Sequence, residues 1–159
     1  MRINNITGLI KATAGAVTQA TAGSDYLTTR VVGIQVVGGA TALSTGDGKA
    51  YLRIPAALNG MNLASANIQV ITTSSSGLPT VQIARGRQAT PTSNFTYADM
   101  LTTKITIDAT EYDSKDAAAA AVIDTSNDDV VTGDVIRVDV DVAGTGTTGL
   151  NVTLTFQLP

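Results

Sequence analysis

The chain contains no cysteine and no histidine, and these two absences exclude several kinds of chemistry. Without cysteine there is no disulfide and no thiolate nucleophile or metal ligand, which suits synthesis in a reducing cytoplasm. Without histidine the chain lacks the usual general base near neutral pH and the commonest transition-metal ligand. Zinc sites and Ser-His-Asp triads are therefore excluded, and a carboxylate pair or an oxygen-ligand calcium site remains possible.

Charged and aromatic residues are both scarce, at 14% and 4% of the chain, and tryptophan is absent. The polar surface must therefore come largely from Thr, Ser, Asn and Gln, and a Val/Ile/Leu core completed partly between subunits fits the lack of large rings. The net charge is −3, and the ten Lys and Arg residues form no basic stripe. We therefore expect no nucleic-acid partner.

Long apolar runs are also missing. No stretch approaches the roughly 20 apolar residues that a helix needs to cross a bilayer. The first residues, Met1 to Asn5, are polar and lack the apolar centre of a signal peptide. We expect no membrane partner and no secretory signal.

Two segments near the C-terminus alternate apolar and polar residues with a period of two. The apolar positions are Ile136, Val138, Val140 and Val142 in the first, and Leu150, Val152, Leu154, Phe156 and Leu158 in the second. Because successive side chains of a strand point to opposite faces, the pattern predicts two half-buried strands with their Asp, Arg, Asn, Thr and Gln residues in water. The Gly/Thr segment 143–148 between them predicts a hairpin.

Further strand candidates lie upstream, separated by Gly, Asn, Asp and Pro: 31–37, 50–54, 63–71, 81–83, 101–107 and 122–123. The first is apolar on both faces, so we expect it to be buried on both sides, in the sandwich or in a subunit interface. About eight short strands without a convincing amphipathic helix predict an all-β fold. The expected architecture is an antiparallel β-sandwich, jelly-roll-like, over residues 31–159, with an extended N-terminal arm over residues 1–30.

The arm is rich in Gly, Ala and Thr and has too few large apolar residues to bury its own surface. A flexible extension and an ordered arm that needs a partner surface both fit this composition. Its motifs Gly8-Leu9-Ile10-Lys11, Gly15-Ala16-Val17 and Ala20-Thr21-Ala22-Gly23-Ser24-Asp25-Tyr26-Leu27 resemble a segment that recurs in the tail fibres of tailed bacteriophages. In those fibres the segment lies before or between folded trimeric modules.

A second resemblance covers most of the remaining chain. The segments that carry it are Gly46 to Pro55, Leu58 to Leu63, Asp99-Met100-Leu101, Ile105 to Asp108, Ala121 to Asp124 and Gly133 to Asp139. Together they are similar to a module at the outer ends of virion proteins of tailed phages. The resemblance implies a homotrimeric, non-enzymatic structural protein that is displayed on the virion surface and made in the cytoplasm of the host bacterium.

The resemblance leaves the place on the particle open. Related tail fibres are usually much longer, so we expect a small head-fibre or capsid-decoration protein whose arm docks on other virion proteins, in the capsid or the tail. The alternative is a receptor-binding tail-fibre tip that serves host attachment by binding a bacterial surface glycan. The expected docking or trimer residues are the larger apolar residues of the arm and of the strand 31–37: Leu9, Ile10, Val17, Tyr26, Leu27, Val32, Ile34 and Val36.

Charged residues concentrate in two regions of the sequence, one basic and one acidic. The basic cluster Arg85-Gly86-Arg87-Gln88 is expected to be a solvated strand end that opposes an acidic surface, the alternative being an anion or acidic-sugar contact. The acidic region 108–134 suggests calcium, because flexible loops with hard oxygen ligands suit that ion. However, the segment 124–129 lacks the ligand spacing of an EF-hand, so we expect turns and solubilising charges and no cofactor. No carboxylate pair stands out for glycoside hydrolysis, and we expect no enzyme activity.

Overall fold

The computed structural model describes residues 10–13, 16–20 and 28–159. Nearly all regular structure in these residues is antiparallel strand, which confirms the all-β prediction. The strands are β1 (Ile10–Thr13), β2 (Ala16–Gln19), β3 (Thr29–Ala42), β4 (Gly46–Arg53), β5 (Met61–Gln69), β6 (Thr80–Arg87), β7 (Thr96–Asp99), β8 (Leu101–Thr103), β9 (Ile105–Thr106), β10 (Val122–Ile123), β11 (Asp129–Val130), β12 (Val135–Val142) and β13 (Thr148–Gln157). A single turn of 3-10 helix, Ala56–Leu58, follows Pro55, which has no amide hydrogen to continue β4.

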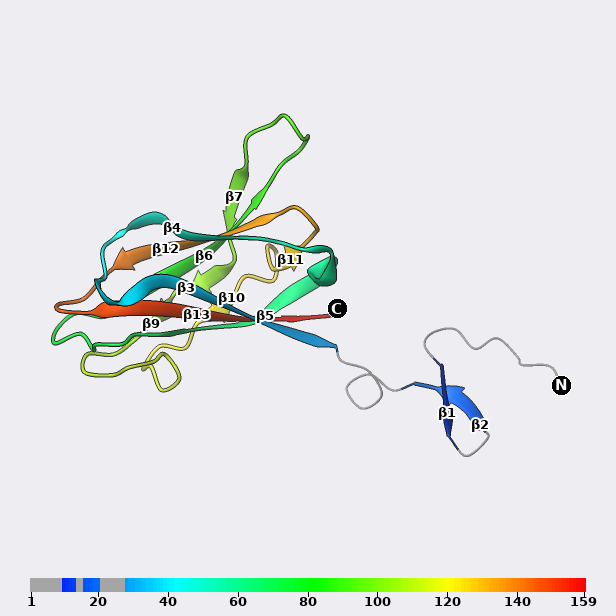
Figure 1. The fold of residues 1–159 in the computed structure, drawn as a ribbon, viewed down its shortest axis with the longest axis horizontal. Coiled ribbons are helices and arrows are strands. Elements are labelled where there is room, and N and C mark those ends of the chain that lie inside the picture. The colour runs from blue at the N-terminus through cyan, green and yellow to red at the C-terminus, as the bar shows by residue number, and fades with distance from the viewer. Residues whose placement is uncertain (1–9, 14–15, 21–27) are drawn as a thin grey trace.

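Two sheets form a sandwich with the strand orders β11-β5-β13-β3 and β4-β12-β6-β7. Figure 1 shows the two sheets as separate layers, with β3, β13 and β5 in one and β4, β12 and β6 in the other. Along the chain the strands change sheet at every step from β3 to β6, and again from β7 through β11 and β12 to β13. This alternation of eight strands between two sheets is the jelly-roll order. The short strands β8, β9 and β10 lie in the long connection between β7 and β11.

The predicted C-terminal hairpin is wrong, although both of its strands exist. β12 pairs with β4 and β6, whereas β13 pairs with β3 and β5, so the two strands belong to different sheets. The connection 143–147 crosses from one sheet to the other and does not reverse within one sheet. Packed sheets lie only about 10 Å apart, a distance that five residues span easily.

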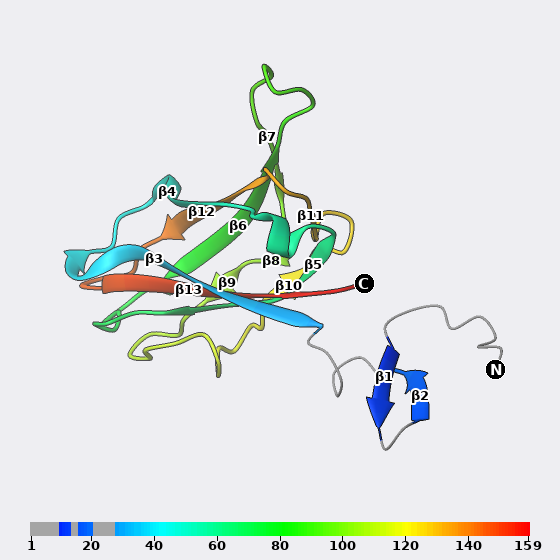
Figure 2. The ribbon, with the colours of Figure 1, turned by 45° about the vertical axis from the view of Figure 1, so that its right-hand side comes forward.

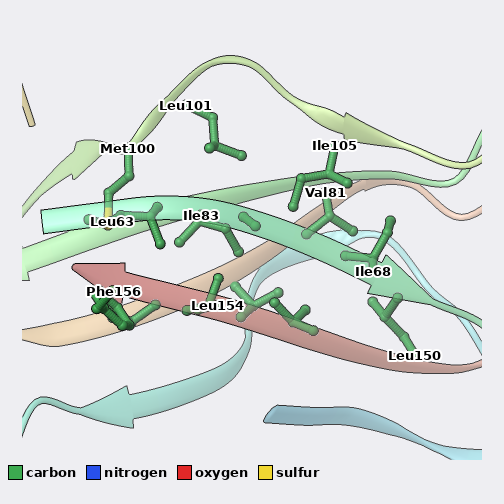
Figure 3. Close-up of a cluster of buried hydrophobic side chains, with 14 of the residues drawn as sticks. Leu63, Ile68, Val81, Ile83, Met100, Leu101, Ile105, Leu150, Leu154 and Phe156 are labelled. Carbon is green, nitrogen blue, oxygen red and sulfur yellow. The ribbon is translucent and has the colours of Figure 1, made fainter. Parts of the chain in front are cut away.

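The core lies between the two sheets and is built from aliphatic side chains, two methionines and one phenylalanine (Figure 3). The predicted inward residues of β12 and β13 are almost all fully buried: Ile136, Val138, Val140, Leu150, Val152, Leu154 and Phe156. The exceptions are the last apolar residues of the two patterns. Val142 and Leu158 are 42% and 43% exposed, because each lies where its strand leaves the facing sheet.

Asp139 is the second departure from the predicted alternation. It was expected in water but is buried between Val138 and Val140, next to a register shift in the pairing of β12 with β4. Its carboxylate accepts hydrogen bonds from the Gly48 amide at 2.7 Å and from the Arg137 guanidinium at 2.7 Å. The burial of Asp139 is therefore compensated by an opposite charge and a backbone donor.

The sandwich has two distinct ends. The chain enters it beside the end of β13, where the Leu158 amide donates to the Thr28 carbonyl at 2.9 Å. The connections 43–45, 70–79 and 143–147 lie at the opposite end, as the pairing of Thr148 with Ala42 and of Val142 with Thr80 shows (Figures 1 and 2).

Strands β1 and β2 form a two-stranded sheet of their own, with Ile10 opposite Gln19. A lone two-stranded hairpin is marginally stable in water, since it has little surface to bury. The segment that was expected to be an extended arm therefore contains one short antiparallel unit ahead of the sandwich.

Candidate functional site

On the outer face of their sheet, strands β3, β13 and β5 share a continuous surface in which nine residues carry no charge. Three rows run across strands β3, β13 and β5: Gln35, Asn151 and Gln69; then Gly33, Thr153 and Asn67; then Val31, Thr155 and Ser65. Their neighbours along β3 and β13, and Ala66 and Ile68 of β5, pack in the core, so these nine residues face outward. We call them the uncharged face. All except Val31 and Gly33 carry an amide or a hydroxyl group.

A groove of about 470 Å³ lies on this face along β5. Asn67, Gln69, Asn151 and Thr153 form its floor, and the segment 113–115 forms one wall. Its polar lining offers amide and hydroxyl groups that both donate and accept hydrogen bonds, next to one carboxylate and one ammonium group. Such a lining suits an uncharged polyhydroxyl or peptide-like partner and lacks an apolar anchor.

The wall is fixed to the edge of β5 by backbone and side-chain bonds. The Ser114 amide donates to the Ile68 carbonyl at 3.0 Å, and the Ile68 amide donates to Ser114 Oγ at 3.0 Å. Asp113 forms a β-bridge with Gln69, and its carboxylate accepts a bond from the Lys115 amide at 2.8 Å. The wall is therefore an ordered extension of the sheet, and Asp113 and Lys115 mark the border of the uncharged face.

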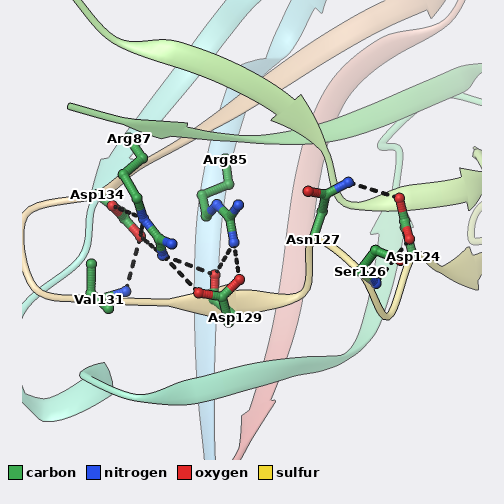
Figure 4. Close-up of polar contacts among 8 residues, drawn as sticks. All are labelled: Arg85, Arg87, Asp124, Ser126, Asn127, Asp129, Val131 and Asp134. Atoms are coloured by element: carbon green, nitrogen blue, oxygen red, sulfur yellow. Dashed lines mark hydrogen bonds and ion pairs between the residues drawn. The ribbon is translucent and has the colours of Figure 1, made fainter. Parts of the chain in front are cut away.

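The charged residues gather on the other sheet and at its margins. Each ion pair described within the sandwich has a partner on β6 or β12. Figure 4 shows the largest group, in which Arg85 and Arg87 of β6 meet Asp129 and Asp134. The two Arg87–Asp134 contacts from Nε and Nη2 to the carboxylate are 3.0 and 2.7 Å, the forked geometry that suits a guanidinium.

Burial and pairing shift the pKa values in this group. The hydrogen bond to Asp134 is the main reason why the pKa of Arg87 lies above its ordinary value, outweighing burial. For Asp129, burial favours the neutral acid, but the hydrogen bond from Arg87 and the charges of both arginines outweigh it and lower the pKa. Pairing therefore favours the charged forms of Arg87 and Asp129, and both side chains are engaged by partners within the protein.

The predicted solvated strand end at Arg85 to Gln88 is only half correct. The cluster does oppose acidic residues, but Arg85 is buried and fixed to Asp129, so it is unavailable for an anion from solution. The alternation of Val81, Ile83 and Arg85 along β6 already places Arg85 on the inward face. That pattern is the signal by which its burial could have been found.

The acidic loop considered for calcium forms a turn. Asp124 accepts bonds from the Ser126 amide at 3.0 Å and from the Asn127 side chain at 2.9 Å, and the backbone bond is the main cause that lowers its pKa. Asp129 is engaged by the two arginines. Within the described ranges of the chain, no group of three or more acidic side chains is arranged to hold a metal ion.

The residues predicted for docking or trimer contact have different positions. Leu9, Tyr26 and Leu27 lie outside the described residues, while Ile10 and Val17 belong to β1 and β2, whose backbone pairing alone is described at these positions. Val32, Ile34 and Val36 of β3 are half-buried and pack against the core of their own sandwich.

Strand β3 is not buried on both sides within one chain. It is the edge strand of its sheet, and Val31 on its outer face is 66% exposed. The outward residues Val31, Gly33 and Gln35 therefore form the part of β3 that a partner can reach. Sequence reasoning missed the groove as well, because the segment 113–115 joins β5 only through tertiary pairing.

No protein-family model matches the chain, and no curated protein and no solved structure gave a match either. In the part of the chain that the structure describes, no helix is long and apolar enough to cross a membrane.

Proposed function

We propose that the chain is a non-enzymatic structural component of a tailed-phage virion, displayed on the particle surface as a small homotrimeric head-fibre or capsid-decoration protein. The jelly roll supports this proposal at the level of fold analogy, because it is a common architecture of viral capsid domains. The resemblances of the N-terminal segment and of the strand-forming segments to phage virion proteins support it at the level of sequence.

The opposite placement of the chain entry and the long loops carries the proposal. The N-terminal segment joins the sandwich at Thr28, whereas the loops 70–79, 107–121 and 143–147 lie at the far end (Figure 1). An N-terminal segment docked on a particle would hold this far end away from it. This is the geometry of a protein with one anchoring end and one displayed end.

The displayed loops are held together by a buried hydroxyl. Ser74 Oγ donates to the Ser76 carbonyl at 2.6 Å and accepts from the Thr145 amide at 3.0 Å, which ties the loop 70–79 to the loop 143–147. The Thr110 amide donates to the Ser74 carbonyl at 2.8 Å and adds the third loop. The far end is therefore a fixed surface, on which Leu78 and Tyr112 are exposed.

The first test is an inventory of the proteins in heads and tails, separated from a phage that encodes this chain and resolved by mass spectrometry. We expect the chain in the head fraction. Finding it only with the tails would replace the head-fibre role by the tail role, and its absence from both fractions would refute the proposal.

A truncated chain tests the docking end. Deletion of residues 1–27 leaves the sandwich intact from Thr28 onward, so the shortened protein should fold. It should not join particles that lack the protein, whereas the full chain should. If the truncated protein is incorporated normally, docking lies elsewhere.

The alternative role, a receptor-binding tip for a bacterial surface glycan, is favoured by one observation, the polar groove along β5. Its amide floor and its Asp113 and Lys115 wall match the hydrogen-bonding pattern of saccharide hydroxyls. Titration calorimetry with surface polysaccharide from the host tests it. Saturable binding that Asn67→Ala removes and Thr125→Ala preserves would favour the receptor-binding role.

A further inference from the structure

We infer that the uncharged face is the contact surface between copies of this chain and lies close to the symmetry axis of the assembly. This inference deepens the homotrimer part of the proposed function by naming the surface, and it does not depend on where the protein sits in a virion.

The chemistry of the face is self-complementary. Amide and hydroxyl groups both donate and accept, so each can pair with an identical group on another copy. In a closed symmetric assembly, residues near the axis meet the same residues of the neighbouring copies, and any charge there would face its own kind. The three rows of the uncharged face contain no Asp, Glu, Lys or Arg, so they avoid this repulsion.

The distribution of charge over the sandwich singles out this face. The opposite sheet carries the ion pairs of Arg87, Arg137 and Asp141, which would have to be desolvated or face like charges in a symmetric contact. The charged wall residues Asp113 and Lys115 stand at the border of the uncharged face. Protein interfaces in general show this distribution, because charged residues are depleted at their centres and occur at their rims.

The edge of β3 adds a second, independent reason. β3 is 14 residues long and pairs only with β13 along its length, so its other edge has no partner strand among the described residues. Monomeric proteins protect such edges with lysine, proline or inward charges. β3 has none of these except Arg30 near its start. The space beside Gly33 is open, since a Cβ added there would meet no atom within 4 Å.

Val31 completes the surface. It is exposed in the third row, beside Thr155 and two residues along β3 from the small Gly33. An isolated exposed valine needs no explanation, but here it adjoins an unprotected strand edge and a surface without charge. A second copy packed on the face would cover all three features at once.

The test is the oligomeric state of the purified full-length protein, measured by native mass spectrometry and sedimentation at micromolar concentration. Thr153→Lys places a charge in the central row, and Asn67→Lys places one on the neighbouring strand; both positions are exposed, and circular dichroism checks folding. Thr125→Lys makes the same change at an exposed position off the face.

We expect an oligomer for the wild type and for Thr125→Lys. Both face variants should be folded and should dissociate, with a dissociation constant raised on the order of a hundredfold, because like charges then meet near the axis. Mixing Thr153→Lys with Thr153→Asp should restore association. A monomeric wild type, face variants that assemble normally, or equal dissociation of Thr125→Lys would each overturn the inference. None of these outcomes bears on whether the protein is found in virions.

Discussion

Arg85 on β6 and Asp129 on β11 form an ion pair that links the two sheets of the sandwich. The side chain of Arg85 is 10% exposed, that of Asp129 is 47% exposed, and the same arginine also donates to the Asp129 carbonyl at 2.7 Å. β11 has only two residues and pairs with β5 through them alone. The arginine therefore adds a side-chain link from the facing sheet to a short strand that the buried Val130 also anchors in the core.

Removing the acid should cost more than removing the base. Asp129→Ala leaves the buried Arg85 without its counter-charge, and we expect a loss of about 1–3 kcal/mol, reduced from the fully buried case by the exposure of Asp129. Arg85→Met replaces the guanidinium by an apolar chain and should cost less than about 1 kcal/mol. Urea unfolding followed by circular dichroism measures both. The reverse order would show that Arg85 stabilises the fold through contacts other than the Asp129 carboxylate, such as its bond to the Asp129 carbonyl.

The same contact predicts how stability depends on pH. The pKa of Asp129 lies below its usual 3.8, because the two arginines outweigh the opposing effect of burial. Its contribution is therefore complete above the unfolded pKa and is lost as pH falls through the lower folded pKa. Thermal melts of the wild type should show stability decreasing below about pH 3.8, and Asp129→Asn should show a shallower decrease. Parallel profiles for the two proteins would contradict this prediction.

The alternation of apolar residues predicted which side chains form the core, and it did so well. Leu150, Val152, Leu154 and Phe156 are all buried, because the period of two follows directly from strand geometry. The alternation did not predict which strands pair with one another. A segment such as 143–147 is long enough either to close a hairpin or to cross between sheets, and its Gly/Thr composition suits both.

The surfaces could be predicted only in part. Val32, Ile34 and Val36 were recognised as apolar, but only the folded structure shows that they pack against the core of their own sandwich. The uncharged face depends on register, since Gln35, Asn151 and Gln69 form a row only after three distant strands pair. Long-range pairing of this kind leaves no local pattern in the sequence.

Leu154 inside β13 and Leu158 just beyond its end offer a matched test of the core. Leu154 is fully buried, whereas Leu158, just beyond the strand, is 43% exposed although the alternation predicted both to point inward. Leu154→Ala should lower the free energy of unfolding by about 2–5 kcal/mol, because it leaves a cavity in a packed core. Leu158→Ala should cost less than about 1 kcal/mol. Denaturant unfolding of both variants measures the two losses. Equal losses would mean that the boundary of the core does not lie between these two residues.

Gly86 of β6 pairs with Tyr97 of β7, whose ring covers it, and the Arg137 guanidinium lies 4.2 Å from the ring centroid. A Cβ at Gly86 would lie 2.7 Å from Tyr97 Cε1, so the ring must move and its contact with Arg137 must change. We expect Gly86→Ala to cost about 1–3 kcal/mol, as overpacking does.

Gly38→Ala is the control, because its added Cβ would meet only Thr41 Oγ1 at 3.7 Å, and it should change stability by less than about 1 kcal/mol. In a double-mutant cycle, Gly86→Ala should cost less when Tyr97 is already serine, since the clash is gone. Thermal and urea unfolding of the four proteins measure this coupling, and strictly additive losses would mean that the ring does not restrict this position.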